Sequence, residues 1–118
     1  MEKLFDAELR LMEIIWECEP ISAKDVSSLT AERFQWNKNT TYTVIKRLID
    51  KEVLRRNDPG FICSALVKRD EVQRSETKTL IDKLFGGSKK TFFAAFANEN
   101  LSSDEVDALK ALIEKSEV

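Results

Sequence analysis

The sequence predicts a mostly α-helical protein with a small β-hairpin wing: a winged helix-turn-helix domain over residues 1–69 and a C-terminal helical dimerisation domain over residues 70–118. The prediction comes from the order of three patterns. In about the first 50 residues, apolar side chains recur with helical spacing. A Pro-Gly turn between two apolar runs follows, and the rest of the chain again has helical spacing.

Composition favours a binding protein over an enzyme. The sequence contains no His, and its two cysteines, Cys18 and Cys63, are not in a CxxC pair. We therefore expect no metal site, no cofactor, and no catalysis by His or by a Cys/His pair. No stretch approaches the roughly 20 apolar residues of a membrane span, and the N-terminus lacks a signal-peptide core. We expect a cytoplasmic protein that does not contact a membrane.

The first two helical segments should form the start of the helix-turn-helix. Asp6 can cap the first helix, which must end before Pro20. That helix carries an apolar stripe made of Leu9, Met12, Ile15 and Trp16. Ser22 with Asp25 has the spacing of a capping box, and the second helix is expected to end near Arg33.

The third segment, residues 37–49, should be a helix with two different faces. Asn37 is a suitable N-cap. The inward stripe consists of Thr41, Val44, Ile45, Leu48 and Ile49. The outward face carries Asn39, Tyr42, Thr43, Lys46 and Arg47. An amide, hydroxyls and cations are the groups that hydrogen-bond base edges and phosphates, so we predict a recognition helix for double-stranded DNA. The alternative is a solvated face that happens to lack acidic residues.

Positive charge is concentrated around this helix. The net charge is −2 and the pI about 5.3, which would argue against a nucleic-acid partner. Residues 38–69, however, hold eight Lys and Arg against three Asp and Glu. Residues 1–37 hold four against eight, and residues 70–118 hold seven against ten. The local excess lies where phosphate contacts would need it.

A β-hairpin is predicted directly after the recognition helix. Pro59 and Gly60 suit the central positions of a type II turn between the runs 53–56 and 61–67. A hairpin in this place is the wing of a winged helix, with Arg55 and Arg56 as candidate phosphate contacts. The alternative for each arginine is an ordinary charged strand edge.

Three further helices are predicted in the C-terminal part. The first covers residues 70–85 and ends at Gly86-Gly87, the second begins near Ser88, and the third begins with Ser102 and Glu105 as a capping box. We expect the following residues to pack against a second copy: Leu80, Leu84, Phe92, Phe93, Phe96, Val106, Leu109, Leu112 and Ile113. The alternative is that these helices fold back on the N-terminal domain.

Several motifs follow one another in an order typical of one family. They are the helix Leu9–Trp16 followed by Ser22-Ala23, then Trp36-Asn37-Lys38-Asn39-Thr40-Thr41-Tyr42-Thr43-Val44-Ile45-Lys46-Arg47-Leu48, Gly86-Gly87, and Leu101-Ser102-Ser103-Asp104-Glu105. In this order and spacing the chain resembles the BlaI/MecI/CopY repressors, the penicillinase repressor family, over nearly its whole length.

This resemblance implies a homodimeric repressor that binds operator dyads containing TACA and TGTA elements. Recognition-helix contacts would fall on Asn39, Thr40, Thr43 and Arg47. The full set of candidate DNA-binding residues is Asn37, Lys38, Asn39, Thr40, Tyr42, Thr43, Lys46, Arg47, Arg55 and Arg56. Family members often have Ser-Pro in place of Asn37-Lys38, and some have a non-aromatic polar residue in place of Tyr42.

Two departures from the family concern regulation. In penicillinase repressors, a membrane-bound β-lactam sensor with a protease domain induces cleavage at an Asn-Phe bond, where this chain has Ala94-Ala95. The C-terminal cysteine cluster of the copper-responsive branch is also absent. The resemblance implies an inducing protease or sensor as a candidate partner. It also implies β-lactam resistance genes as candidate targets. A winged-helix module that binds proteins without specific DNA binding is the alternative function.

Overall fold

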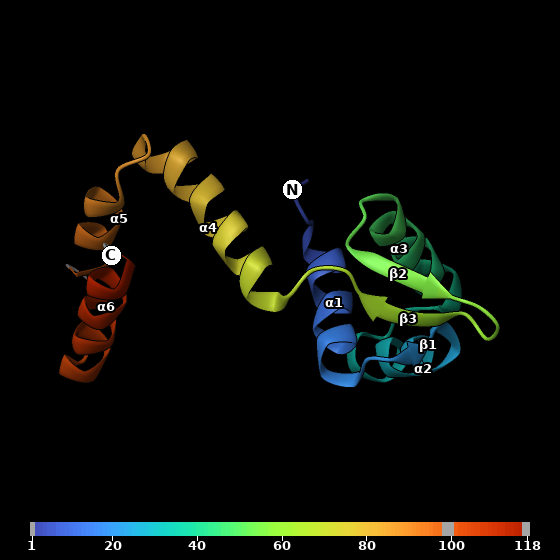
Figure 1. Ribbon diagram of the computed structural model, residues 1–118. Helices are drawn as coiled ribbons and strands as arrows, with labels where there is room; N and C mark the ends of the chain where they lie inside the picture. The colour runs from blue at the N-terminus through green and yellow to red at the C-terminus, as the bar shows by residue number, and fades with distance from the viewer. Residues whose placement is uncertain (1, 98–100, 117–118) are drawn as a thin grey trace. The chain divides into compact units, whose positions relative to one another are not determined.

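The protein, in a computed structural model that describes residues 2–97 and 101–116, is mostly helical with one small antiparallel sheet (Figure 1). This confirms the predicted fold class. The elements are α1 (Asp6–Cys18), β1 (Ile21–Ser22), α2 (Ala23–Phe34), α3 (Lys38–Asp50), β2 (Leu54–Asn57), β3 (Ile62–Ala65), α4 (Arg69–Phe85), α5 (Lys89–Ala97) and α6 (Ser103–Ser116).

The chain divides into two compact units, and the division falls within α4, between Glu76 and Thr77. The beginning of α4 belongs to the N-terminal unit, since Val72 is part of its buried core. The backbone N–H of Leu4 also donates to the Glu76 carboxylate at 3.1 Å. The functional assignment of residues 1–69 and 70–118 as separate domains stays a prediction.

Two of the predicted N-caps in the N-terminal unit are confirmed. The Asn37 side chain accepts a hydrogen bond from the Thr40 N–H at 2.8 Å, and the Ser22 hydroxyl accepts one from the Asp25 N–H at 3.1 Å. Each bond satisfies a donor that the first turn of a helix leaves unpaired.

The predicted cap at Asp6 is wrong. Asp6 is the first residue of α1, and the residue before it, Phe5, occupies the N-cap position. The Glu8 carboxylate reaches back and accepts the Phe5 N–H at 2.8 Å, so the helix starts one residue earlier than a cap at Asp6 would allow. Asp6 instead lies in the first turn, where a negative charge is favourable because of the helix dipole.

The predicted hairpin is confirmed, and it belongs to a three-stranded sheet with the order β1-β3-β2. In the turn, Gly60 has φ +95° and the next residue, Phe61, has φ +49°. Strand β1 was not predicted, because two residues after a proline carry no alternating pattern. It pairs Ile21 with Cys63 and Ser22 with Ile62.

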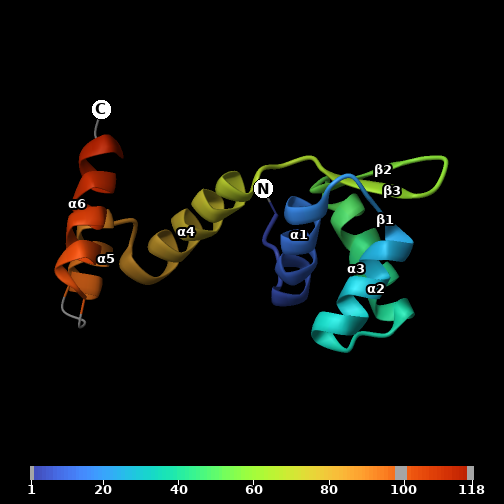
Figure 2. The ribbon, with the colours of Figure 1, turned by 90° about the horizontal axis from the view of Figure 1, so that it is seen from below.

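The core of the N-terminal unit lies between the three helices and the sheet, which runs along one side of them (Figure 2). The predicted inward stripe of α3 is confirmed, since Thr41, Val44, Ile45 and Leu48 are buried and Ile49 is half-buried. Burial of each large aliphatic side chain stabilises the fold by roughly 1.5–3 kcal/mol. Trp16 is half-buried against this core, and its indole N–H donates to the Val67 carbonyl at 3.0 Å.

Two polar contacts inside the unit fix the position of α3. The hydroxyls of Thr30 and Thr41, both buried, share a hydrogen bond of 2.6 Å between α2 and α3. At the other end of α3, the Lys51 ammonium donates to the Glu8 carboxylate at 2.7 Å and to the Lys3 carbonyl at 2.8 Å. The Glu8 side chain is 1% exposed and that of Lys51 15%, so this ion pair is largely shielded from water.

In the C-terminal unit, α4 ends and α6 begins where the sequence predicts. Gly86 and Gly87 have φ +57° and +82°, and the Gly87 N–H donates to the Ile81 carbonyl at 3.1 Å, which ends α4. The predicted capping box of α6 is confirmed: the Ser102 hydroxyl accepts the Glu105 N–H at 3.1 Å, and the Glu105 carboxylate accepts the Ser102 N–H at 3.2 Å.

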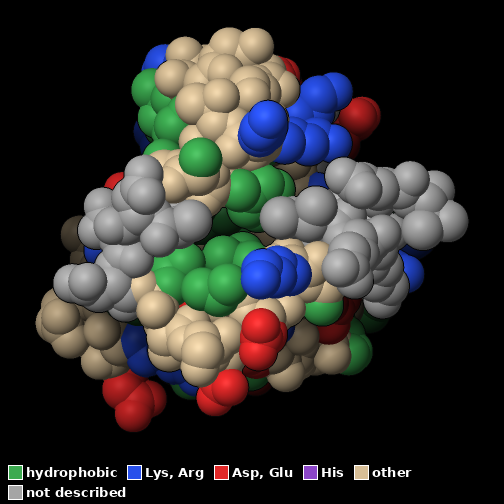
Figure 3. All heavy atoms as spheres, turned by 90° about the vertical axis from the view of Figure 1, so that its left-hand side faces the viewer, with side chains coloured by type: hydrophobic (Ala, Val, Ile, Leu, Met, Phe, Trp, Pro, Cys, Tyr) green, Lys and Arg blue, Asp and Glu red, His purple; other side chains and the backbone are tan. Residues whose placement is uncertain are grey.

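Aromatic rings gather in the C-terminal unit around Phe92. Its ring centroid lies 5.4 Å from those of Phe85 and Phe93 and 4.9 Å from that of Phe96. Hydrophobic side chains nevertheless reach the surface here (Figure 3), including those of Leu80, Leu84 and Phe96, which are 43%, 64% and 46% exposed. The side chains of Leu112 and Ile113 lie outside the described residues.

Two general properties of the described residues bear on the kind of site. In residues 2–97 and 101–116, no helix is long and apolar enough to cross a membrane. Within the same ranges, no three His, Cys, Asp or Glu side chains come together as possible metal ligands. Cys18 and Cys63 are free thiols.

Replacement of Lys51 should destabilise the protein strongly. Lys51→Met leaves the Glu8 carboxylate buried without its counter-charge, so we expect the free energy of unfolding to fall by about 3 kcal/mol. Urea unfolding monitored by tryptophan fluorescence measures this change. The double variant Glu8→Gln/Lys51→Met should recover most of the loss, because no charge remains buried.

The matched control Arg74→Met breaks an exposed pair with Asp70 and should cost at most about 0.5 kcal/mol. An unchanged midpoint for Lys51→Met would contradict this role.

The two thiols should differ in reactivity. Burial raises the pKa of the Cys63 thiol from 9.0 to about 11, and the positive charge of Arg56 offsets part of this rise. Because the thiolate is the reactive form, Cys63 should stay protonated and unmodified at pH 8 and react only as the pH approaches 11. Titration with a disulfide reagent at pH 8 should label half-buried Cys18 in the folded protein and both thiols in urea. Equal labelling rates in the folded protein would show that Cys63 is not shielded.

Candidate nucleic-acid interface

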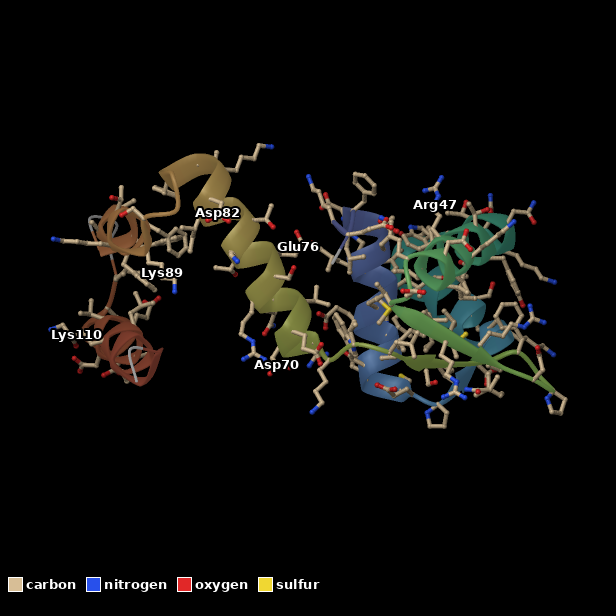
Figure 4. The ribbon with its side chains drawn as sticks, turned by 45° about the horizontal axis from the view of Figure 1, so that its top comes forward. Arg47, Asp70, Glu76, Asp82, Lys89 and Lys110 are labelled. Atoms are coloured by element: carbon tan, nitrogen blue, oxygen red, sulfur yellow. The ribbon has the colours of Figure 1, made fainter. Side chains whose placement is uncertain are left out.

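The outward face of α3 is polar and open to solvent. Asn39, Thr43, Lys46 and Arg47 are all exposed, as are Asn37, Lys38 and Thr40 at the start of the helix. Figure 4 shows Arg47 projecting from α3 away from the other helices of its unit. Because the opposite face of α3 is buried, its outer groups are held on a rigid helix.

Hydrogen bonds at the start of α3 determine which atoms remain available. The Thr43 hydroxyl donates to the Asn39 carbonyl at 2.8 Å, so this hydroxyl can still accept a hydrogen bond and offer its methyl group. The Asn37 side-chain oxygen is occupied by the Thr40 N–H, which leaves its NH₂ group as a donor. The amide side chain of Asn39 can both donate and accept, as recognition of an adenine edge requires.

Within the described residues, Lys46 and Arg47 of this face lack the ion pairs that other cations of the N-terminal unit form. Arg33 pairs with Glu17 at 3.2 Å and Arg69 with Glu13 at 2.8 Å. Among the residues that the structure describes, no carboxylate lies within ion-pair distance of Lys46 or Arg47. Their charge is therefore available to an anion such as a phosphate.

The two arginines of the wing are not equivalent. Arg55 and Arg56 are neighbours on β2, so their side chains leave opposite faces of the strand. Arg55 is exposed and has no ion pair within the described ranges. The Arg56 Nε–H donates to both carboxylate oxygens of Asp58, at 3.2 and 3.1 Å, so Asp58 offsets part of the Arg56 charge and a phosphate would bind the terminal NH₂ groups of Arg56.

Tyr42 is placed differently from the other candidates. It is half-buried against the core, and its ring meets the ring of Phe61 edge-on at 5.8 Å between centroids. The Lys38 ammonium lies 5.7 Å from the centroid of the same ring. Phe61 was not predicted as part of the site, although an aromatic residue directly after a Pro-Gly turn is a signal that the turn packs against another element.

A helix-turn-helix, formed by α2 and α3 and followed by a β-hairpin, defines a winged-helix protein. The family model described as penicillinase repressor matches residues 4–115. The chain therefore belongs to the penicillinase repressor family, as its motifs predicted.

Individual relatives agree with this assignment. The penicillinase repressor of Staphylococcus aureus is 30% identical over 110 residues, which cover 91% of this chain and 87% of that protein. The methicillin resistance regulatory protein MecI of Mammaliicoccus sciuri is 27% identical over 116 residues, covering 96% and 94%.

Solved structures of BlaI are similar to part of this chain. The solution structure of the DNA-binding domain of the repressor BlaI matches 60% of this chain and 93% of that chain, with TM-score 0.55 and 28% identity. Bacillus licheniformis BlaI, in its monomeric form in complex with the blaP half-operator, matches 59% and 88%, with TM-score 0.54 and 26% identity.

Proposed function

We propose that this protein represses transcription by binding operator DNA as a homodimer, with α3 in the major groove and the β2–β3 wing against the phosphate backbone. The observation that carries the proposal is the outward face of α3, where Lys46 and Arg47 lack a carboxylate partner among the described residues. Membership of the penicillinase repressor family supports it, as does the similarity to BlaI bound to a half-operator.

The proposed contacts follow from the chemistry of each side chain. Asn39 and Arg47 suit adenine and guanine edges, because an amide and a guanidinium each form paired hydrogen bonds there. Thr40 and Thr43 offer hydroxyl and methyl groups to the same groove. Phosphates would be bound by Lys38, Lys46 and Arg55, by the Asn37 NH₂ group, and by the terminal NH₂ groups of Arg56. Tyr42 would contribute its hydroxyl.

The C-terminal helices are proposed to form the dimer. Leu80, Leu84 and Phe96 expose apolar surface that a second copy would bury. The half-buried Phe92, Phe93, Val106 and Leu109 would extend this interface, together with Leu112 and Ile113. Two copies would place two α3 helices on the two halves of a dyad, which increases both affinity and specificity.

The proposal extends to targets and release. β-Lactam resistance genes are the first targets to test, since the relatives are named penicillinase repressor and methicillin resistance regulatory protein. Release would require an inducing protease or sensor. Ala94 and Ala95, which stand in place of the family's Asn-Phe cleavage pair, are exposed on α5.

Arg47→Ala should weaken operator binding by roughly 1–3 kcal/mol, the range expected when a paired contact to a base is lost. Fluorescence anisotropy with a labelled duplex containing TACA and TGTA elements, and with a scrambled duplex of equal composition, measures it. Preference for the operator duplex should fall along with affinity. The matched control Arg74→Ala removes an exposed arginine of α4 and should bind as the wild type does.

The same titrations at several salt concentrations test the phosphate contacts. Affinity of the wild type should fall steeply with salt, with a slope of about −0.9 for each phosphate neutralised. Equal and weak binding of both duplexes by folded wild-type protein would overturn operator binding and favour the protein-interaction module.

Leu84→Lys should shift the protein from dimer to monomer, because it places a charge in the proposed apolar interface. Sedimentation velocity at several concentrations measures the shift. Leu66→Lys is the matched control, since Leu66 is also an exposed leucine but lies in the N-terminal unit. If both variants remain as dimeric as the wild type, the interface is assigned to the wrong surface.

A further inference from the structure

Phe61 connects the wing turn to three other elements. Its ring meets Tyr42 of α3 at 5.8 Å, and the Arg56 guanidinium of β2 lies 3.7 Å from the ring centroid. Its carbonyl accepts a hydrogen bond from the N–H of Ala23, the first residue of α2, at 2.9 Å. One residue of the turn therefore contacts both helices of the helix-turn-helix and the wing strand that carries the arginines.

The backbone of Phe61 shows that these contacts hold it in place. Its φ of +49° lies in the left-handed region, which is unfavourable for a bulky side chain and persists only where the surroundings impose it. The Asp58 carboxylate accepts the Phe61 N–H at 3.3 Å and also binds the Arg56 Nε–H. The turn, its aromatic ring and the wing arginine thus form one connected unit.

We propose that Tyr42 and Phe61 are positioning residues for DNA binding: their edge-on ring contact sets where the wing lies relative to α3. This inference rests on the proposed function and adds a second role for Tyr42. The role lies in the ring, because the ring is half-buried against Phe61, whereas no hydrogen bond of the Tyr42 hydroxyl occurs within the described ranges.

The consequence for binding follows from the geometry. Once α3 lies in the major groove, the distance from the wing to the phosphates depends on how firmly the turn is held to α3. Loss of either ring should loosen Arg55 and Arg56 relative to the backbone of the DNA. Affinity should therefore fall through phosphate contacts, while discrimination between sequences, which depends on α3, should be retained.

The experiment uses the full chain and two kinds of variant. Tyr42→Phe and Phe61→Tyr keep both rings, whereas Tyr42→Ala and Phe61→Ala each remove one. Phe34→Ala is the matched control, because it removes a ring from the Phe34–Trp36 pair, at 5.5 Å, outside the wing contact. Operator and scrambled duplexes are titrated by anisotropy at several salt concentrations, after urea unfolding has shown that each variant is folded.

Phe61→Tyr and Phe34→Ala should bind within about 2-fold of the wild type, and Tyr42→Phe should keep the wild-type salt slope, because it keeps the ring. Each ring-removing variant should lose about 2- to 10-fold in affinity for both duplexes, the equivalent of one aromatic pair. Its salt slope should become shallower by about 0.9 per lost phosphate contact. Tyr42→Ala/Phe61→Ala should lose no more than either single variant, because the two rings act as a pair.

Other outcomes would overturn the inference. A salt slope in Tyr42→Phe as shallow as that of Tyr42→Ala would assign the effect of Tyr42 to its hydroxyl and not to its ring. Additive losses in the double variant would show that the rings act separately.

A measurement without DNA separates this inference from the proposed function. The backbone amide resonances of Asp58, Gly60 and Phe61 should shift and broaden in Tyr42→Ala but not in Tyr42→Phe. Wild-type resonances in Tyr42→Ala would overturn the positioning role whatever the DNA result. A loosened turn in Tyr42→Ala, together with wild-type protein that binds both duplexes equally and weakly, would overturn the proposed function alone and leave the ring contact as a feature of the fold.

Discussion

The buried ion pair between Glu8 and Lys51 is the interaction on which the placement of α3 depends. Lys51 is the C-cap of α3, and Glu8 lies in the first turn of α1, where its carboxylate also accepts the Phe5 N–H. The other end of α3 is tied to α2 through the hydroxyls of Thr41 and Thr30. Apolar burial alone permits small rotations and slides of a helix, whereas these polar contacts permit only the arrangement in which both are satisfied. The outer face of α3 is therefore presented in a fixed orientation.

An acidic protein can offer a DNA-binding surface because pairing distributes its charges unevenly. Arg33 and Arg69 are neutralised by neighbouring glutamates, and Arg56 is held by Asp58. Lys46, Arg47 and Arg55 have no such partner in the part of the chain that the structure describes. Net charge sets the average potential far from the molecule, but a phosphate in contact responds to the nearest charges, because screening in physiological salt extends only about 8 Å.

Much of the candidate interface was predictable because it lies on one helix. The 3.6-residue period places Asn39, Thr43, Lys46 and Arg47 on the outer face of α3 as soon as the inner stripe is recognised, and the structure exposes all four. The wing was less predictable. Arg55 and Arg56 look equivalent in the sequence, but Asp58 binds only Arg56, since the turn brings that carboxylate back towards β2. The role of Phe61 depends on a ring contact across 19 positions of sequence, which no local pattern encodes.

The order of the helices, their caps at Ser22, Asn37 and Ser102, the hairpin and the family could all be inferred from the amino-acid sequence alone. These features rest on interactions between residues three or four positions apart, or on turn residues, so a short stretch of sequence contains all the information. Tertiary packing fixes four other features: the start of α1, the third strand, the pairing of Glu8 with Lys51 and the contact of Tyr42 with Phe61. Each of these features depends on residues that are distant in the sequence. Such residues meet only when the helices and the sheet pack together.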